Sequence, residues 1–87
     1  QLACVLRDFG IRPESKVGIC IERSHEMMIG IFAIVKAGAA YVPIDPHYPT
    51  DRIAFVINDA AISVVLTHSK FLDRLGSAQP AKVLCLD

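Results

Sequence analysis

The residues best placed for chemistry lie in AYVPIDPHYPT, residues 40–50. Asp45 follows a predicted strand, and Tyr41 and Tyr48 flank it with phenolic hydroxyls. Open parallel sheets bind ligands beyond the carboxyl ends of their strands, so a catalytic carboxylate at Asp45 is one interpretation. The other is structural, because an aspartate before proline in a tight loop usually accepts hydrogen bonds from backbone amides. From the residues alone, the structural interpretation is the stronger one.

Prolines at 43, 46 and 49 give this segment a regular spacing. Proline fixes its own φ near about −65° and pushes the preceding residue into extended conformations. We therefore expect a stiff, polyproline-like stretch from Pro43 to Pro49 that ends the strand and directs Thr50 into the next helix.

Metal or thiol chemistry has little support in the sequence. Three cysteines lie far apart among apolar neighbours: Cys4, Cys20 and Cys85. This pattern favours small buried thiols in a reducing compartment, and hence a cytoplasmic protein. Three histidines share no ligand spacing with each other or with the cysteines, so we expect surface or capping roles and no metal site: His25, His47 and His68.

Other site motifs are missing. The sequence has neither GxGxxG nor GxSxG, so neither a glycine-rich nucleotide-binding loop nor a hydrolase nucleophile elbow is encoded. Glu22, Asp45 and Asp87 superficially supply the acidic cluster of a phospho-receiver or flavodoxin-like domain. The first strand, however, ends in Glu22-Arg23 without an acidic pair, which makes this the weakest hypothesis.

Composition limits the chain to one domain or less. With 87 residues it can bury only a modest core, yet 53% of its residues are apolar. Some apolar surface should therefore contact something else. Nine basic and nine acidic side chains balance, which predicts neither nucleic acid nor an anionic membrane as partner. The longest apolar run, Met27 to Val35, is far shorter than the ~20 residues of a membrane span.

The elements expected to position these residues alternate between helix and strand. Periodicity and end signals predict helices over residues 2–9, 25–37, 51–60 and 69–75, and strands over 17–21, 40–44, 63–67 and 82–87, with a loop over 76–80. Ser24, Thr50 and Ser69 are the expected N-caps. Continuous apolar strands linked by helices predict an α/β fold: a three-layer, Rossmann-like parallel sheet of about four strands with helices on its faces.

The sequence also predicts which elements are buried and whether the chain is part of a longer one. The helix at 25–37 is apolar around most of its circumference, which predicts that it is buried, with Met27 and Met28 filling the core. The last predicted strand should also be buried. Because a helical pattern opens the chain at Gln1 and a strand closes it at Asp87, we expect a piece of a longer polypeptide.

The segment VKAGAAYVPIDPHYPTDRI, residues 35–53, closely resembles the second core motif of nonribosomal peptide synthetase adenylation domains. Twelve positions match: Lys36, Ala37, Gly38, Ala40, Tyr41, Pro43, Asp45, Pro46, Tyr48, Pro49, Arg52 and Ile53. Val35 replaces the usual Leu. Flanking segments, including QLACVLRDFGI and VGICIERSHEMM, resemble the same family in the same order, so the resemblance covers essentially the whole chain.

The resemblance implies that residues 1–87 are an N-terminal part of an AMP-binding adenylation domain. The parent would activate an amino acid with ATP and Mg²⁺ to an aminoacyl adenylate and load it onto a carrier-protein phosphopantetheine thiol, as in antibiotic biosynthesis. Its partners would be the remainder of the adenylation domain and the carrier and condensation domains. The family's phosphate-binding loop, pocket residues and catalytic lysine lie downstream, so these residues should be inactive and cofactor-free alone.

Accordingly, no catalytic, cofactor-binding or metal-binding role is assigned to any residue, including Lys36, Lys70 and Lys82. Lys36 instead suits the negative end of its helix. The alternative hypothesis is a non-catalytic scaffold or interaction module that docks the rest of the synthetase or self-associates. Excess apolar surface motivates that alternative.

Overall fold

The structure, a computed structural model, describes residues 2–8, 10–22, 24–76, 80 and 82–87. Its elements alternate as the sequence predicts: α1 (Leu2–Asp8), β1 (Lys16–Cys20), α2 (His25–Lys36), β2 (Ala40–Pro43), α3 (Thr50–Asp59), β3 (Val64–Thr67), the 3₁₀ helix η1 (Ser69–Leu75) and β4 (Lys82–Cys85). Phe9, and residues 77–79 of the expected loop, lie outside the described residues.

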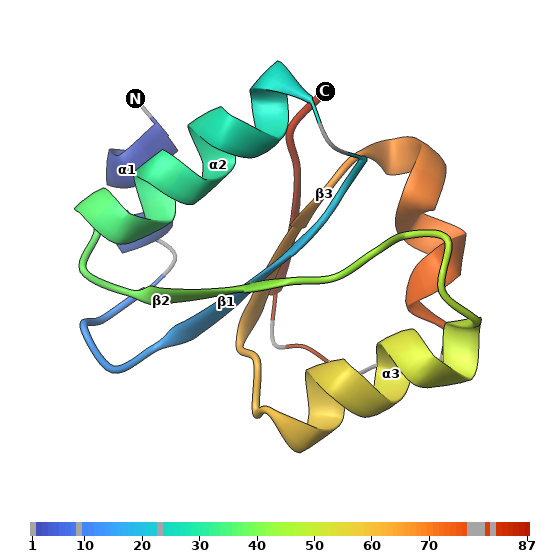
Figure 1. The fold of residues 1–87 in the computed structure, drawn as a ribbon. Helices are drawn as coiled ribbons and strands as arrows, with labels where there is room; N and C mark the ends of the chain where they lie inside the picture. The colour runs from blue at the N-terminus through green and yellow to red at the C-terminus, as the bar shows by residue number, and fades with distance from the viewer. Residues whose placement is uncertain (1, 9, 23, 77–79, 81) are drawn as a thin grey trace.

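The four strands form one parallel sheet in the order β2-β1-β3-β4. Val17 in the central strand β1 aligns with Tyr41 of β2 on one side and with Val64 of β3 on the other. Figure 1 shows α1 and α2 over one face of the sheet and α3 over the other. The predicted α/β class, with a parallel sheet between two helical layers, is confirmed.

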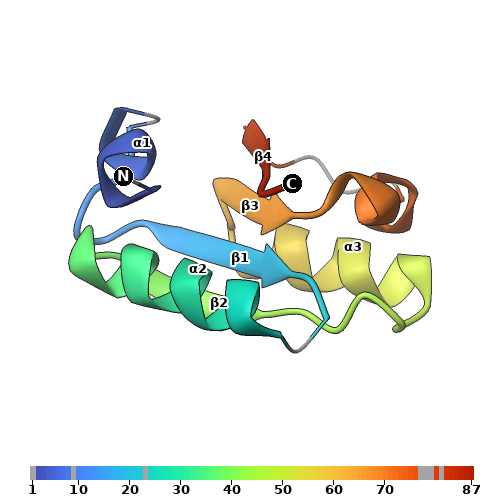
Figure 2. The same cartoon turned by 90° about the horizontal axis from the view of Figure 1, so that it is seen from above.

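Successive side chains of β1 and β3 point to opposite faces, and this alternation divides the apolar core in two. On the α1–α2 face, Val17, Ile19 and Leu66 pack with Leu6 and Ile34. A second core lies on the α3 face: Cys20, Ile44, Ile53, Ile57, Ile62, Val65 and Leu75. Figure 1 separates the two helical layers, while Figure 2 looks onto the strands from the side of α1 and α2. Both faces of β1 and β3 are thus covered, which explains why their sequences are continuously apolar.

Both ends of α2 form as their local signals predict. The hydroxyl of Ser24 accepts a hydrogen bond from the Met27 amide (3.3 Å), which satisfies one of the first amides of the helix. At the other end Gly38 adopts φ +86°, a conformation that favours glycine, and its amide donates to the Val35 carbonyl (2.9 Å).

The outer face of α2 contradicts the prediction that this helix is buried all round. Gly30, Ala33 and Ile34 are buried against the sheet. Four large apolar side chains are exposed: Met28 (67%), Ile29 (49%), Phe32 (72%) and Val35 (55%). A helix on a single sheet can bury only one side, and in the part of the chain that the structure describes no residue covers the other. Met27 is half-buried against the core as expected, whereas Met28 is not.

The inner side of α2 approaches the sheet closely at Gly30. A Cβ atom at this position would lie 2.7 Å from Cδ1 of Ile19, a side chain with no exposed surface. Real Cβ atoms do not approach a carbon so closely, so only glycine fits without displacement of Ile19.

Three predicted boundaries need correction. Helix α3 begins at Thr50 and Pro49 is its N-cap residue, so Thr50 does not cap it; the Pro49 carbonyl accepts from the amides of Arg52 (3.0 Å) and Ile53 (3.1 Å). The short helix after β3 is a 3₁₀ helix, with His68 as N-cap residue and Ser69 inside it.

Strand β4 lies at the edge of the sheet, so it is less buried than expected. It also ends at Cys85 and not at residue 87. Of the three cysteines only Cys20 is fully buried, while Cys85 is half-buried and Cys4 is exposed on α1. The prediction of three buried thiols is therefore wrong for Cys4, whose apolar sequence neighbours do not place it on the inner side of its helix.

Pro43 occupies a position where its missing amide breaks no ladder. The amides of Ala40 and Ile44, at either end of β2, donate inward to carbonyls of residues 15 and 19 (3.1 and 2.9 Å). Since amides alternate in direction along a strand, those of Tyr41 and residue 43 face the open edge. Proline is tolerated on an edge strand for this reason.

Candidate functional site

The candidate site is the end of the sheet at which β1, β2 and β3 finish. The chain leaves β1 toward β2 on one side, and it leaves β3 toward β4 on the other. This divergence creates a topological switch point, the position where open α/β sheets bind ligands. Three segments meet there: the one that follows β1 at Glu22, the one that follows β2 at His47, and the one that follows β3 at Lys70.

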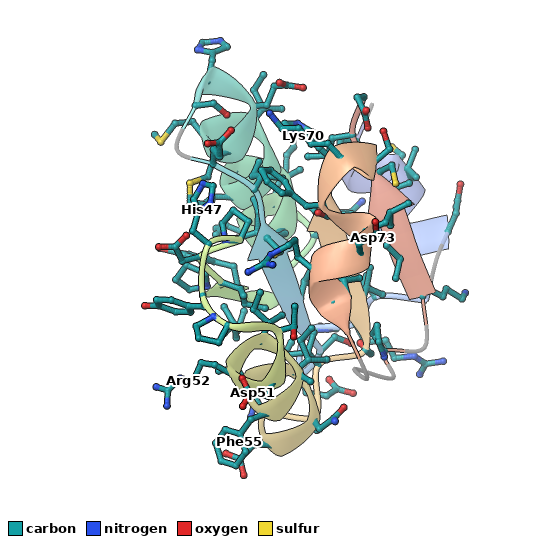
Figure 3. All side chains as sticks on the ribbon, turned by 90° about the vertical axis from the view of Figure 1, so that its right-hand side faces the viewer. His47, Asp51, Arg52, Phe55, Lys70 and Asp73 are labelled. Atoms are coloured by element: carbon teal, nitrogen blue, oxygen red, sulfur yellow. The ribbon has the colours of Figure 1, made fainter. Side chains whose placement is uncertain are left out.

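Glu22 joins the three segments through its carboxylate. Oε2 lies 3.2 Å from Nε2 of His47, and Oε1 accepts a hydrogen bond from Nζ of Lys70 at 3.2 Å. Figure 3 shows His47 and Lys70 at the same end of the sheet, while Asp51, Arg52 and Phe55 lie on α3. The three side chains are about half exposed or more, so each of these two contacts is weak and solvent-screened.

A second set of contacts involves aromatic rings. His68 stacks on Phe71 with centroids 6.5 Å apart, and its Nε2 lies 3.3 Å from Oε2 of Glu26 without hydrogen-bond geometry. Nζ of Lys70 lies 5.1 Å from the Phe71 centroid, within cation–π range. His47 meets the same ring edge-on at 6.1 Å. The buried Phe71 ring therefore packs against the Lys70 ammonium group and against two imidazole rings, and these groups come from two of the three segments.

Hydrogen bonds at this site favour ionised carboxylates. The hydrogen bonds from His47 and then Lys70 lower the pKa of Glu22 below its ordinary value. Hydrogen bonds from the Ser69 hydroxyl and amide likewise lower the pKa of Asp87. A lowered pKa is the reverse of what a general base working near neutral pH needs, so the contacts of Glu22 point to a linking role.

Asp45 adopts the structural role that its sequence context favours. Its Oδ1 accepts from the His47 amide at 2.9 Å, and its carbonyl accepts from the Tyr48 amide at 3.1 Å. These bonds form a tight turn with Pro46 in its second position, where proline is favoured. The predicted polyproline-like stretch from Pro43 to Pro49 is therefore wrong, because polyproline helices contain no internal hydrogen bonds.

A hollow of about 570 Å³ opens beside this turn. Apolar and polar side chains line it together: Ile21, Glu22, Met27, Pro43, Ile44, Asp45, Pro46, His47 and Tyr48. Tyr41 is not among the lining residues, so only one of the two tyrosines expected beside Asp45 shares its surroundings.

Arg74 holds the turn from outside the motif. From η1, its Nε donates to the carbonyl of Pro46 (3.0 Å) and its Nη2 donates to the carbonyl of Tyr48 (2.6 Å). Two bonds from one planar guanidinium fix both the position and the orientation of the loop. The sequence carries no local signal for this role, since the partners lie 28 and 26 residues away.

Cys20 lies beneath the site and has no exposed surface. Burial, with a smaller contribution from the Asp45 carboxylate and an opposing one from Arg74, raises the pKa of its thiol to about 11. The thiol therefore stays protonated and poorly nucleophilic at neutral pH. The neighbouring hydroxyl of Thr67 is also buried and donates to the Cys20 carbonyl at 2.7 Å, which ties β3 to β1.

The lysines discussed from the sequence are dispersed. Lys36 lies in the last turn of α2, where its charge suits the helix dipole, and its carbonyl accepts from Nη2 of Arg7 at 3.2 Å. Lys82 begins β4, and only Lys70 lies at the candidate site. Within the described ranges, no group of three or more histidine, cysteine or acidic residues could hold a metal ion, and no helix is long and apolar enough to cross a membrane.

The family model described as AMP-binding enzyme matches residues 1–87, and the chain belongs to this family.

Within the family, its similarity is to nonribosomal peptide synthetases. A linear gramicidin synthase of Brevibacillus parabrevis is 58% identical over 87 residues, which is 100% of this chain and 2% of that protein. Tyrocidine synthase 3 of the same organism is 49% identical over 100% of this chain and 1% of its own length. The chain thus spans a small part of the curated relatives that it matches. The adenylation-domain resemblance stated from residues 35–53 is confirmed.

Solved structures agree with the sequence relatives. The nonribosomal peptide synthetase FmoA3, in its alpha-methyl-L-serine-AMP bound form, has a TM-score of 0.88 and 34% identity, with 97% of this chain and 10% of that chain covered. An AMPPNP-bound form of the same protein also matches. AB3403, a four-domain nonribosomal peptide synthetase bound to AMP and glycine, has a TM-score of 0.86 and 38% identity over 97% of this chain and 6% of its own.

Proposed function

We propose that residues 1–87 are the scaffold of the N-terminal part of an amino-acid-activating adenylation domain. The parent would convert an amino acid and ATP into aminoacyl-AMP and pyrophosphate, and would then load a carrier-protein phosphopantetheine thiol. The supporting observation is the 58% identity across the whole chain to a synthetase of which it represents 2%. We place this activity, and partnership with carrier and condensation domains, in the cytoplasm.

The contacts at the candidate site support a scaffold role. The polar side chains of Glu22, His47 and Lys70 bond to one another there, and the buried Cys20 thiol is protonated at neutral pH. The turn after β2 is held by Asp45 from within and by Arg74 from outside. This arrangement fixes the direction in which the chain passes from β2 into α3.

ATP and Mg²⁺ do not fit the residues described. ATP needs a phosphate-binding loop with a lysine, and Mg²⁺ needs carboxylates free to coordinate it. Both oxygens of Glu22 already have cationic or imidazole partners, and Lys70 is bonded to Glu22. We therefore derive no catalytic step from residues 1–87, and place the nucleotide and metal groups elsewhere in the parent.

Amino-acid-dependent pyrophosphate exchange tests this proposal. The full-length protein that carries these residues should exchange labelled pyrophosphate into ATP with at least one amino acid, whereas the isolated 87 residues should not. Exchange by the isolated chain would contradict the scaffold role. Failure of the full-length protein with every amino acid would contradict the parent activity.

The exposed face of α2 supports a second candidate, an interaction module without catalysis that docks the synthetase or associates with itself. Sedimentation of the isolated chain tests this second candidate. A compact monomer at micromolar concentration that binds no apolar dye contradicts the docking module, because a docking surface should bind both dye and partner.

A further inference from the structure

We propose that the outer face of α3, with Phe55 at its centre, is the surface on which a separately folded neighbouring domain of the same polypeptide docks. The inference rests on the proposed function, which gives the parent carrier and condensation domains beside its adenylation domain. It adds the surface that meets a neighbour and the chemistry that this neighbour presents. That chemistry is an apolar recess for the Phe55 ring, bordered by lysine or arginine.

Phe55 is an aromatic side chain on the side of α3 that faces away from the core. The inner side of the helix is already filled by Ile53, Ala54 and Ile57, which are buried. Phe55 is 60% exposed, and among the large apolar side chains described outside α2 it is the most exposed. Figure 3 shows its ring directed away from the body of the molecule. Such a ring can bury roughly 150–250 Å² against a partner, so it can serve as an anchor.

Polar side chains surround Phe55 on the same helix. Asp51 and Asp59 lie four residues before and after it, and both are exposed. Arg52 lies three residues before it and Asn58 three residues after it, and both of these are exposed as well. Residues three and four apart are neighbours on a helix surface, so the four form a rim around the ring. An apolar centre within a polar rim is the arrangement found where separately folded partners meet.

The charges of this rim define the chemistry of the partner. Asp51 and Asp59 contribute two negative charges and Arg52 one positive charge, which leaves the face with one negative charge. The last turn of α3, which contains Asp59, has no basic residue to offset the negative end of the helix dipole. Since partners place opposite charges across an interface, we expect a lysine or arginine of the partner opposite Asp59.

The attachment of α3 suits a face that is presented in a fixed orientation. Pro49, at the N-cap position of the helix, directly follows the turn that Asp45 holds from within and Arg74 from outside. A surface on a helix that is already fixed loses little conformational freedom when it binds, which favours docking. The scaffold role of residues 1–87 would thus include the positioning of this face.

A domain of the same polypeptide is the occupant because of its concentration. The solved relative AB3403 has four domains, and 97% of this chain matches 6% of that protein. A domain tethered by a short flexible linker acts at an effective concentration of about millimolar, which allows a small interface with one aromatic anchor to form. A second copy in solution would need a stable interface of about 1,200–2,000 Å² in total, which one exposed ring does not supply.

Site-specific photo-crosslinking in the full-length protein tests the proposal. Phe55 is replaced by p-benzoylphenylalanine, the folded protein is irradiated, and the crosslinked peptides are located by mass spectrometry. We expect a crosslink to a segment of another domain that carries lysine or arginine. A crosslink within the adenylation domain or between two copies would overturn the proposal, and so would the absence of any crosslink to another domain.

The control places the same photoreactive residue at Glu14, which is exposed in the turn before β1. Position 14 should not crosslink to the segment that position 55 reaches, and an equal yield from both positions would overturn the proposal. Pyrophosphate exchange is measured on the same preparation. A crosslink between domains without exchange contradicts only the proposed function, and exchange without such a crosslink contradicts only this inference.

Variants at position 55 give an independent readout. With the photoreactive residue at position 58, one helical turn away, Phe55→Glu should lower the yield of the crosslink between domains several-fold, because a carboxylate cannot enter an apolar recess. Phe55→Leu keeps an apolar side chain and should retain most of the yield. Equal yields for the two variants would contradict the central role of Phe55. If Phe55→Glu yields no folded protein, the crosslink from position 55 decides.

Discussion

At the scale of single residues, Glu22 is the side chain that links the segments after three strands. Its two carboxylate oxygens contact His47 and Lys70, and neither contact survives protonation of the carboxylate unchanged. Because these hydrogen bonds lower the pKa of Glu22 in the folded state, its ionised form stabilises that state.

The pH dependence follows from this sign. The contribution of Glu22 is fully present above its unfolded-state pKa, which is about 4.3 for an unperturbed glutamate, and is lost as pH falls through the lower folded-state pKa. Glu22→Gln should therefore reduce the loss of stability between neutral and strongly acidic pH. Urea unfolding of the full-length protein across that range measures the difference. Glu14→Gln, at an exposed glutamate in the turn before β1, is the control; equal pH profiles for the two variants would refute the linking role of Glu22.

Arg74 is the second residue with a testable role. Removing its guanidinium breaks two hydrogen bonds to the turn carbonyls, and bonds from charged groups contribute roughly 1.5–3 kcal/mol each at most. Arg74→Ala should lower the free energy of unfolding by about 1–3 kcal/mol, and Arg74→Lys by less, because an ammonium group cannot reach both carbonyls in the same geometry.

Urea unfolding of the full-length protein measures this effect, and limited proteolysis reports whether the turn at 45–48 opens first. Arg52→Ala is the matched control, since Arg52 is an exposed arginine on α3. Indistinguishable unfolding curves for Arg74→Ala and Arg52→Ala would show that the contacts of Arg74 contribute nothing.

Asp45 and Arg74 show where sequence reasoning succeeds at this scale and where it fails. The hydrogen bonds of Asp45 could be predicted because Asp-Pro chemistry acts within three positions. The role of Arg74 could not, because the chain must first fold to bring η1 beside the turn. The same reason hides the contact between Glu22 and Lys70, which are 48 residues apart.

At the scale of elements, the contact between α2 and β1 depends on Gly30 and Ile19. Gly30→Ala gains about 0.8–1 kcal/mol of helix propensity but forces a methyl group against Cδ1 of Ile19, and overpacking costs about 1–3 kcal/mol. We expect a net loss of stability. In an Ile19→Val background, which removes Cδ1, the same Gly30→Ala change should become stabilising.

Thermal or urea unfolding of the four proteins in this cycle gives the coupling energy directly. If Gly30→Ala changes the free energy of unfolding equally in both backgrounds, the two positions are not coupled. That result would contradict the close contact between Gly30 and Ile19.

The ends of α2 could be predicted because their signals are local, whereas the exposure of its outer face could not. Ser24 and Gly38 define α2 through their own conformations, so the predicted boundaries hold within a residue. The exposure of the outer face of α2 could not be predicted, because an apolar pattern around a helix indicates burial without specifying what covers each side. The polyproline prediction failed for a different reason, because the turn formed by Asp45 and Pro46 supplies hydrogen bonds that an extended stretch lacks.

At the scale of the whole molecule, the parallel sheet followed from the sequence because alternating helices and continuous apolar strands allow few topologies. The order β2-β1-β3-β4 was not specified by any residue pattern, yet it determines which segments share the candidate site. The prediction that apolar surface is left over agrees with an outer face of α2 that remains exposed.

The position of Pro43 has a consequence for how this sheet can grow. Along the outer margin of β2, proline removes one of the amides that a further strand would need, while β4 directs the amides of Val83 and Cys85 outward with no proline among its four residues. A further strand that joins this sheet, during folding or in misassembly, meets a row of outward amides uninterrupted by proline beside β4 but not beside β2. Extension of the sheet is thus one-directional.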